Sequence, residues 1–170
     1  NNADFSVYAT GSYRNNTNVR LDSDIDVGVV LTNCFFHNLP EIGLTPAHLG
    51  LGSAAYGYHE FRSDVENALQ AKFGSGMSTG DKAFNNHANT YRLDADVAVF
   101  CQYRKYSGQR NPDGTLHYLE GAELRPNGNR NKRIVNWHQQ HYENGVAKNN
   151  STGRRFKRVT RILKRLRNDM

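Results

Sequence analysis

Two apolar runs of this chain have aspartates at their start. Residues 25–31, Ile-Asp-Val-Gly-Val-Val-Leu, form a nearly continuous apolar run that is typical of a largely buried strand. Asp24 and Asp26 stand at the head of this run. Alternate residues of a strand point to the same face, so the two carboxylates are expected side by side. Such a pair is costly to bury unless a cation lies between the charges.

Residues 90–100, "TYRLDADVAVF", repeat this arrangement in a second strand. Asp94 and Asp96 alternate with apolar residues, and the run then continues into the core. If the two strands are neighbours, a carboxylate of the second joins the pair of the first. Three carboxylates on adjacent strands suit two divalent cations about 3.5–4 Å apart. The spacing alone leaves open whether Asp94 or Asp96 supplies the third carboxylate.

The remaining pattern predicts further strands and a few helices. A helix over residues 64–73 would begin at a capping box of Ser63 and Glu66 and end at Gly74. Its inner face would consist of Val65, Ala68, Leu69 and Phe73. Strands are predicted over 5–9, 82–85, 116–124 and 133–137, a loop over 38–59, a short helix over 138–144, and a last helix from about 153 with Ser151 or Thr152 as N-cap. This mixture predicts an α+β fold in which helices flank a mixed sheet.

The positive charge of the chain is concentrated near its C-terminus. The formal net charge is +6, but residues 154–167 contain eight Lys or Arg and no acid, so the rest of the chain is slightly acidic. Charge runs are usually solvated helix faces, and this one could also contact phosphates. The same segment has an apolar stripe, which predicts packing on the sheet or on a neighbouring lobe. The stripe consists of Phe156, Val159, Leu163, Leu166 and Met170.

Several other functions find no support in the sequence. Cys34 and Cys101 adjoin apolar runs and are expected to be free thiols, which fits a reducing cytosol. The chain has no apolar run of 18 residues, so we expect no membrane span. The seven histidines do not have zinc-site spacing, and the P-loop motif is absent.

Gly11-Ser12 follows the first predicted strand and suggests a phosphate cradle. Glycine lets the backbone turn sharply and lets a phosphate approach closely. The amides after such a turn, together with the Ser12 hydroxyl, can donate to phosphate oxygens. Carboxylates that hold cations beside such a cradle would bind a nucleoside triphosphate.

Three stretches together resemble a known family. "GSYRNNTNVRLDSDIDVGVVL", "DADVAVF" and "HYENGVAKNNSTGRRFKRVTRILKRLRNDM" are similar to polymerase-beta-type nucleotidyltransferases, and specifically to the bacterial branch related to cyclic GMP-AMP synthase and oligoadenylate synthase. The resemblance implies a catalytic core over residues 1–150. It also implies that residues 151–170 begin a basic helix leading into a C-terminal helical lobe, so we expect the fold to be incomplete at both ends.

The resemblance also assigns roles to particular residues. It implies a catalytic centre with two Mg²⁺ (or Mn²⁺) ions, and favours Asp96 over Asp94 because a short apolar run directly follows the family's third aspartate. In this family the basic helix lies across the cleft from the metals. The implied metal ligands are Asp24, Asp26 and Asp96, and the implied nucleotide-binding residues are Gly11, Ser12, Lys157 and Lys164.

The implied activity is the joining of nucleoside triphosphates into a cyclic or short linear second messenger, with release of pyrophosphate. The resemblance also implies a role in anti-phage signalling. The cysteines fit a cytoplasmic location, and the basic face permits a nucleic-acid activator; a protein activator is the alternative. Two alternatives remain. The enzyme could instead transfer a nucleotide to a protein, an RNA end or a small molecule, or the chain could be a non-catalytic nucleic-acid-binding module that uses the basic helix.

Overall fold

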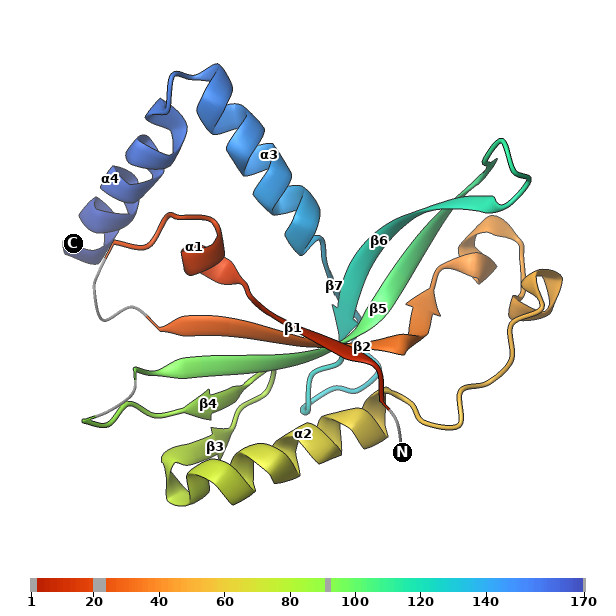
Figure 1. Cartoon of the computed structure of the whole chain (residues 1–170), viewed down its shortest axis with the longest axis horizontal. Coiled ribbons are helices and arrows are strands. Elements are labelled where there is room, and N and C mark those ends of the chain that lie inside the picture. Colours follow the sequence, from red (N-terminus) through yellow and green to blue (C-terminus); the bar gives the residue numbers. More distant parts are fainter. Residues whose placement is uncertain (1–2, 20–23, 91–92, 170) are drawn as a thin grey trace.

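The computed structural model describes residues 3–19, 24–90 and 93–169. The last residue of the predicted stripe, Met170, and residues 91–92 of the second predicted strand lie outside this part. A seven-stranded sheet forms the centre, with helices on both of its faces (Figure 1). The α+β prediction is therefore confirmed. In the described part of the chain, every helix is too short or too polar to cross a lipid bilayer.

The two aspartate-headed strands lie next to each other in the middle of this sheet. They are β2 (Ile25–His37) and β5 (Ala95–Arg110), and they pair in parallel. The other pairings are antiparallel: β1 with β2, β3 with β4, β4 and β6 with β5, and β7 with β6. The bounds of these strands are Phe5–Ala9 for β1, Met77–Thr79 for β3, Phe84–Asn86 for β4, Leu116–Leu124 for β6 and Ile134–Asn136 for β7.

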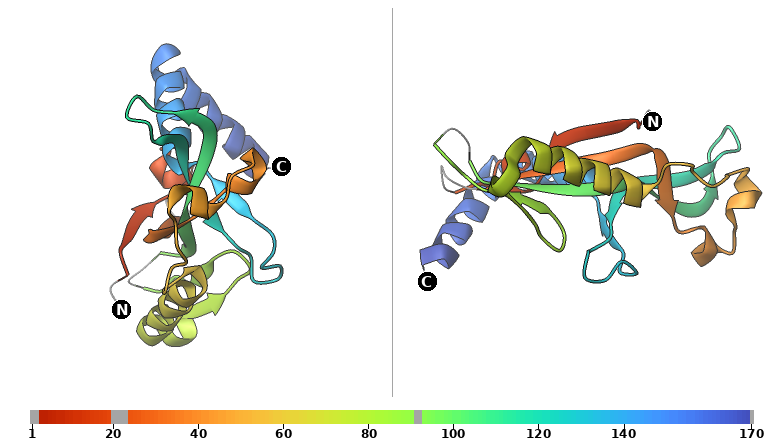
Figure 2. Two further views of the ribbon diagram at one scale, coloured as in Figure 1. Left: turned by 90° about the vertical axis from the view of Figure 1, so that its right-hand side faces the viewer. Right: turned by 90° about the horizontal axis from the view of Figure 1, so that it is seen from below.

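Each face of the sheet has its own hydrophobic core. Helix α2 (Tyr58–Phe73) covers one face, where Phe61 packs against inward residues such as Val29 and Val99. The opposite face carries α3 (His138–Ser151) and α4 (Arg155–Asp169), as two views show (Figure 1, Figure 2). Side chains alternate between the faces of a strand, so the continuous apolar runs of β2 and β5 serve both cores.

Helix α2 begins earlier than the sequence predicts. The capping box predicted at Ser63 is wrong, because the helix already starts at Tyr58, where the Glu60 side chain accepts the Gly57 N–H at 3.2 Å. The Ser63 hydroxyl instead donates to the His59 carbonyl within the helix, at 3.1 Å. Burial of Tyr58 and Phe61 in the core extends the helix towards its N-terminus. Its predicted end at Phe73 is confirmed, whereas Ala68 is exposed rather than part of the inner face.

The segment predicted as a loop over 38–59 contains short helical turns. Two 3₁₀ turns pack over the end of β5 and the start of β6, where Leu39 is fully buried. They are η1 (Leu39–Ile42) and η2 (Pro46–Leu49). A third such turn, η3 (Gly74–Gly76), follows α2. A short helix, α1 (Gly11–Arg14), follows β1 at the Gly-Ser pair.

Helices α3 and α4 differ from the prediction in length and packing. α3 extends to Ser151 rather than 144, so Ser151 cannot cap α4, whereas the Thr152 hydroxyl accepts the Phe156 N–H at 3.2 Å. The apolar stripe of α4 does not pack on the sheet, because its residues are exposed by 39–60%. Within the described residues, α4 contacts α3. The stripe residues are Phe156, Val159, Leu163 and Leu166.

Candidate active site

Two predicted aspartates lie side by side where β2 and β5 begin. In the parallel ladder Asp26 is the register partner of Asp96. Both carboxylates are half-buried and occupy the same face of the sheet as α3. Asp24 lies just before β2 and is exposed. The two acidic strands are therefore neighbours, which is the condition for a third carboxylate to join the first pair.

The Gly-Ser turn lies directly against Asp26. The Thr10 N–H donates to the Asp26 carbonyl at 2.7 Å, and the Ser12 backbone N–H donates to the Asp26 carboxylate. Gly11 has a φ of +56°, and a Cβ at this position would overlap the Asp26 carboxylate. A glycine is required here by both the backbone conformation and the close approach. Gly11 and Ser12 thus lie directly against the Asp26 carboxylate.

The electrostatic environment of Asp26 raises the pKa of its carboxyl group. Burial is the largest cause, followed by the negative charges of Asp96 and Asp24. The Ser12 N–H and the positive charge of Lys164 act in the opposite direction. Four predicted site residues therefore act on the Asp26 carboxylate, and Gly11 lies directly against it; the four are Asp24, Asp96, Ser12 and Lys164.

Asp94 and Asp96 have different partners although both stand in "DAD". The Asp96 carboxylate accepts a hydrogen bond from Asn85 Nδ2 on β4 at 2.7 Å and remains beside Asp26. The Asp94 carboxylate accepts the Ala88 N–H at 2.7 Å and so fastens the loop between β4 and β5. This geometry favours Asp96 over Asp94 as the third site carboxylate.

The two predicted lysines of α4 have different neighbours. Lys164 Nζ donates to the Thr17 hydroxyl at 3.5 Å, and its charge acts on Asp26. Lys157 Nζ lies 5.7 Å from the centre of the Tyr142 ring, in a cation–π contact with α3. The resemblance implies that both lysines bind nucleotide across the cleft from the metals. In the structure, the charge of Lys164 acts on Asp26, whereas Lys157 contacts Tyr142 of α3.

The donor chemistry of the carboxylates suits Mg²⁺, which prefers hard anionic oxygen ligands. Nevertheless, residues 3–19, 24–90 and 93–169 contain no group of three His, Cys, Asp or Glu side chains arranged to hold a metal ion. Asp26 and Asp96 each accept a hydrogen bond from the protein itself.

Sequence reasoning missed three neighbours of these residues. Asn85 contacts Asp96 and stands opposite it in the β4–β5 ladder, a register that the predicted strand over 82–85 does not reveal. Thr17 is buried and accepts a hydrogen bond from Lys164, and no sequence signal marks it. Arg14 lies between the rings of Tyr8 and Tyr142 and thereby links α1 to α3.

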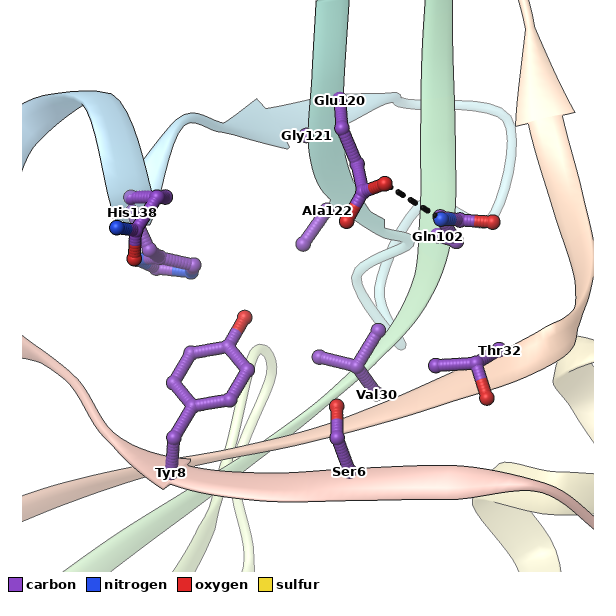
Figure 3. A pocket seen from close by; sticks show the side chains of 10 residues that line it. Ser6, Tyr8, Val30, Thr32, Gln102, Glu120, Gly121, Ala122 and His138 are labelled. Atoms are coloured by element: carbon purple, nitrogen blue, oxygen red, sulfur yellow. Dashed lines mark hydrogen bonds between the residues drawn. The ribbon is translucent and has the colours of Figure 1, made fainter.

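A small polar cavity lies further along the same face of the sheet. It has a volume of about 90 Å³ and is bounded by β1, β2, β5, β6 and the start of α3. Figure 3 shows Tyr8 and His138 on one side of it, and Gln102 donating to Glu120 at 2.8 Å on the other. Neither Asp26 nor Asp96 lines this cavity, so we do not assign it to the candidate active site.

Comparison with known proteins identifies the fold as that of a nucleotidyltransferase. The structure of the Rhodothermus marinus CdnE c-UMP-AMP synthase with Apcpp and Upnpp superposes with a TM-score of 0.84 at 37% identity, covering 98% of this chain and 55% of that one. An Elizabethkingia meningoseptica CdnE cyclic dinucleotide synthase gives a TM-score of 0.71 at 29% identity, covering 95% and 51% of the two chains.

Sequence comparison leads to the same class of protein. A cyclic dipyrimidine nucleotide synthase CdnE of Legionella pneumophila is 45% identical over 169 residues, which is 98% of this chain and 55% of the relative. A second one, from Cecembia lonarensis, is 40% identical over 96% of this chain and 53% of the relative. The family profile of the cGAS/DncV-like nucleotidyltransferase C-terminal helical domain matches residues 143–170. The chain belongs to the bacterial cGAS/DncV-like nucleotidyltransferases (CD-NTases), and it spans about half the length of the curated relatives it matches.

Proposed function

We propose that the full-length protein joins nucleoside triphosphates into a cyclic or short linear second messenger and releases pyrophosphate. The observation that carries this proposal is the register pair of Asp26 and Asp96 beside the Gly-Ser turn. The relatives named above are cyclic nucleotide synthases, and two solved relatives contain nucleotide analogues. CD-NTases are generally metal-dependent enzymes.

The chain's own groups have distinct proposed tasks. Asp24, Asp26 and Asp96 would hold two Mg²⁺ or Mn²⁺ ions, which supply activation of an acceptor hydroxyl and stabilisation of the leaving pyrophosphate. The amides that follow Gly11, with the Ser12 hydroxyl, would bind phosphate oxygens. Lys164 adds a positive charge that acts on Asp26. Lys157 would contact phosphate at the outer end of the same helix.

We further propose that at least one substrate is a pyrimidine nucleotide. The Legionella pneumophila and Cecembia lonarensis relatives are named cyclic dipyrimidine nucleotide synthases, and a Rhodothermus marinus relative is a cyclic UMP-AMP synthase. A cytoplasmic location fits Cys34 and Cys101, which are thiols with sulfur atoms 3.4 Å apart. A protein or nucleic-acid activator and a role in anti-phage signalling belong to the same proposal.

The decisive experiment incubates the full-length protein with each labelled nucleoside triphosphate, alone and in pairs, with Mg²⁺ or Mn²⁺. Mass analysis of the products should show a cyclic or short linear oligonucleotide that contains UMP or CMP. The Asp96→Asn protein is the negative control. A nucleotide found attached to protein, RNA or a small molecule would favour the alternative transferase. Nucleic-acid binding with steep salt dependence and no turnover would favour a binding module.

A further inference from the structure

A cavity with a strongly positive lining lies where the loop after α1 meets the end of α3 and the start of α4. Its volume is about 190 Å³. Four of its six lining side chains are cationic, the other two are neutral amides, and none is acidic. The lining residues are Asn16, Asn149, Arg154, Lys157, Arg158 and Arg161.

The positive charges of this cavity are not neutralised within the described part of the chain. The ion pairs found there join other arginines to glutamates, and none involves the four cations of the cavity. The α4 backbone adds to the charge, because a helix N-terminus is itself positive and favours acidic residues in its first turn. The first turn of α4 contains no acid. Mutual repulsion of these cations is relieved when an anion binds among them.

Hydrogen bonds hold together the backbone segments that surround the cavity. Arg154 has a φ of +64°, a left-handed conformation that is uncommon for a residue with a side chain. Its N–H donates to the Asn149 carbonyl at 2.7 Å, and Arg161 Nη1 donates to the Asn16 carbonyl at 2.8 Å. These bonds tie all three segments that surround the cavity together. The cationic lining is therefore part of an ordered junction.

We propose that this cavity is an oligophosphate-binding site, taking an anion of the pyrophosphate class apart from the carboxylates of the active site. Arginine guanidinium groups match phosphate oxygens with paired N–H donors, and three arginines line the cavity. The two asparagine side chains provide neutral polar groups beside them. Lys157 links the site to the nucleotide-binding residues of α4.

The size and lining of the cavity favour phosphate groups over a nucleobase or a nucleic-acid strand. Pockets that enclose a whole drug-sized ligand usually have volumes of about 300–1,000 Å³, and this one is smaller. No aromatic residue lines it, so it offers no stacking platform for bases. The anion could be free pyrophosphate or the phosphate tail of a nucleotide. The inference extends the proposed function, but binding can be measured without turnover.

The test is calorimetric titration of the full-length protein with pyrophosphate in a buffer that contains EDTA, so that metal-dependent binding at the carboxylates is removed. The double variant Arg154→Gln/Arg158→Gln should weaken binding about 10-fold or more, because two charge-assisted contacts are lost. The matched control Arg155→Gln/Arg167→Gln removes the same charge from α4 outside this cavity and should change the affinity less than about 3-fold. Lys157 stays unchanged because it belongs to the predicted nucleotide-binding set.

Further arms separate this site from the proposed function. Asp26→Asn should retain pyrophosphate binding while its turnover falls, so failure of the pyrophosphate site can be distinguished from failure of the proposed function. Competition between pyrophosphate and a non-hydrolysable nucleoside triphosphate in EDTA would identify the phosphate tail as the source, and lack of competition would identify free pyrophosphate. If Arg154 proves intolerant of change, Arg158→Glu alone should give the same loss. Absence of pyrophosphate binding, equal losses in the control, or binding only to long RNA would overturn the proposal.

Discussion

The two aspartate pairs of this chain look alike in sequence and differ in structure. Asp24 precedes β2 and Asp26 lies within its start, and in the same way Asp94 precedes β5 and Asp96 lies within its start. The second member of each pair enters the ladder, where Asp26 and Asp96 are register partners. The first members diverge, because Asp94 is hydrogen-bonded to the Ala88 N–H whereas Asp24 is exposed and acts on Asp26 through its charge.

This difference shows that the hydrogen-bond donors and charges around a carboxylate determine whether its role is structural or cation-binding. A carboxylate that accepts a backbone N–H fastens a loop, and its charge is stabilised by that donor. A carboxylate placed against two others has a raised pKa and is predisposed to accept a cation. The following predictions test whether the four aspartates differ in function as their partners indicate.

The largest effect is expected for Asp26→Asn in the full-length enzyme. The substitution preserves size and removes the charge, and a neutral amide is a poor ligand for Mg²⁺. Turnover of nucleoside triphosphates should fall by about 10³-fold or more, on the scale of losing a principal electrostatic stabiliser. Initial rates measured by pyrophosphate release would check this. A variant that keeps full turnover would remove Asp26 from the catalytic assignment.

A matched pair of substitutions tests the second aspartate strand. Asp96→Asn should lower turnover by about 10²-fold or more, because it weakens the same carboxylate set while its oxygen can still accept from Asn85. Asp94→Asn removes an equal charge but keeps the acceptor for the Ala88 N–H, so turnover should stay within about 3-fold of wild type. The same rate assay measures both. If Asp94→Asn is the more damaging change, the choice of Asp96 is wrong.

A smaller difference is expected between the two lysines of α4. Lys164→Met removes the positive charge beside Asp26 and should raise the KM for nucleoside triphosphates about 10-fold. It should also raise the pKa of Asp26 further, which shifts the acid limb of the pH–rate profile to higher pH. Lys157→Met should change KM by only about 3-fold, since Lys157 lies over the Tyr142 ring. Equal effects of the two variants would contradict this ranking.

Local patterns predicted most of the sheet, and tertiary contacts account for what they missed. The apolar runs predicted β1, the start of β2 and the whole of β6, because short apolar segments bounded by turn residues are typical of strands. The early start of α2 depends on burial of Tyr58 and Phe61, which a capping signal at Ser63 cannot reveal. Similarly, the aspartates were found from spacing and resemblance, whereas contacts such as Thr17 with Lys164 depend on the packing of distant segments.

The smallest predicted effect concerns the stability of the metal-free full-length protein. The folded-state pKa of Asp26 is raised above its ordinary value, so the ionised carboxylate destabilises the folded state at neutral pH. Asp26→Asn lacks this charge and should therefore be slightly more stable than wild type at pH 7. As the pH falls through the raised pKa, Asp26 becomes protonated in the folded wild-type protein. The advantage of the variant should then shrink, and it should disappear below about pH 3.9, the ordinary pKa of aspartate.

Chemical denaturation of both proteins in EDTA, at a series of pH values, measures this difference. Asp94→Asn is the matched control, because the Asp94 carboxylate accepts a backbone N–H and its substitution should give no such gain at pH 7. A variant Asp26→Asn that is less stable than wild type at neutral pH would show that the Ser12 N–H and Lys164 outweigh burial and the neighbouring charges. Asp26 would then be a structural carboxylate, and the contrast between the two aspartate pairs would disappear.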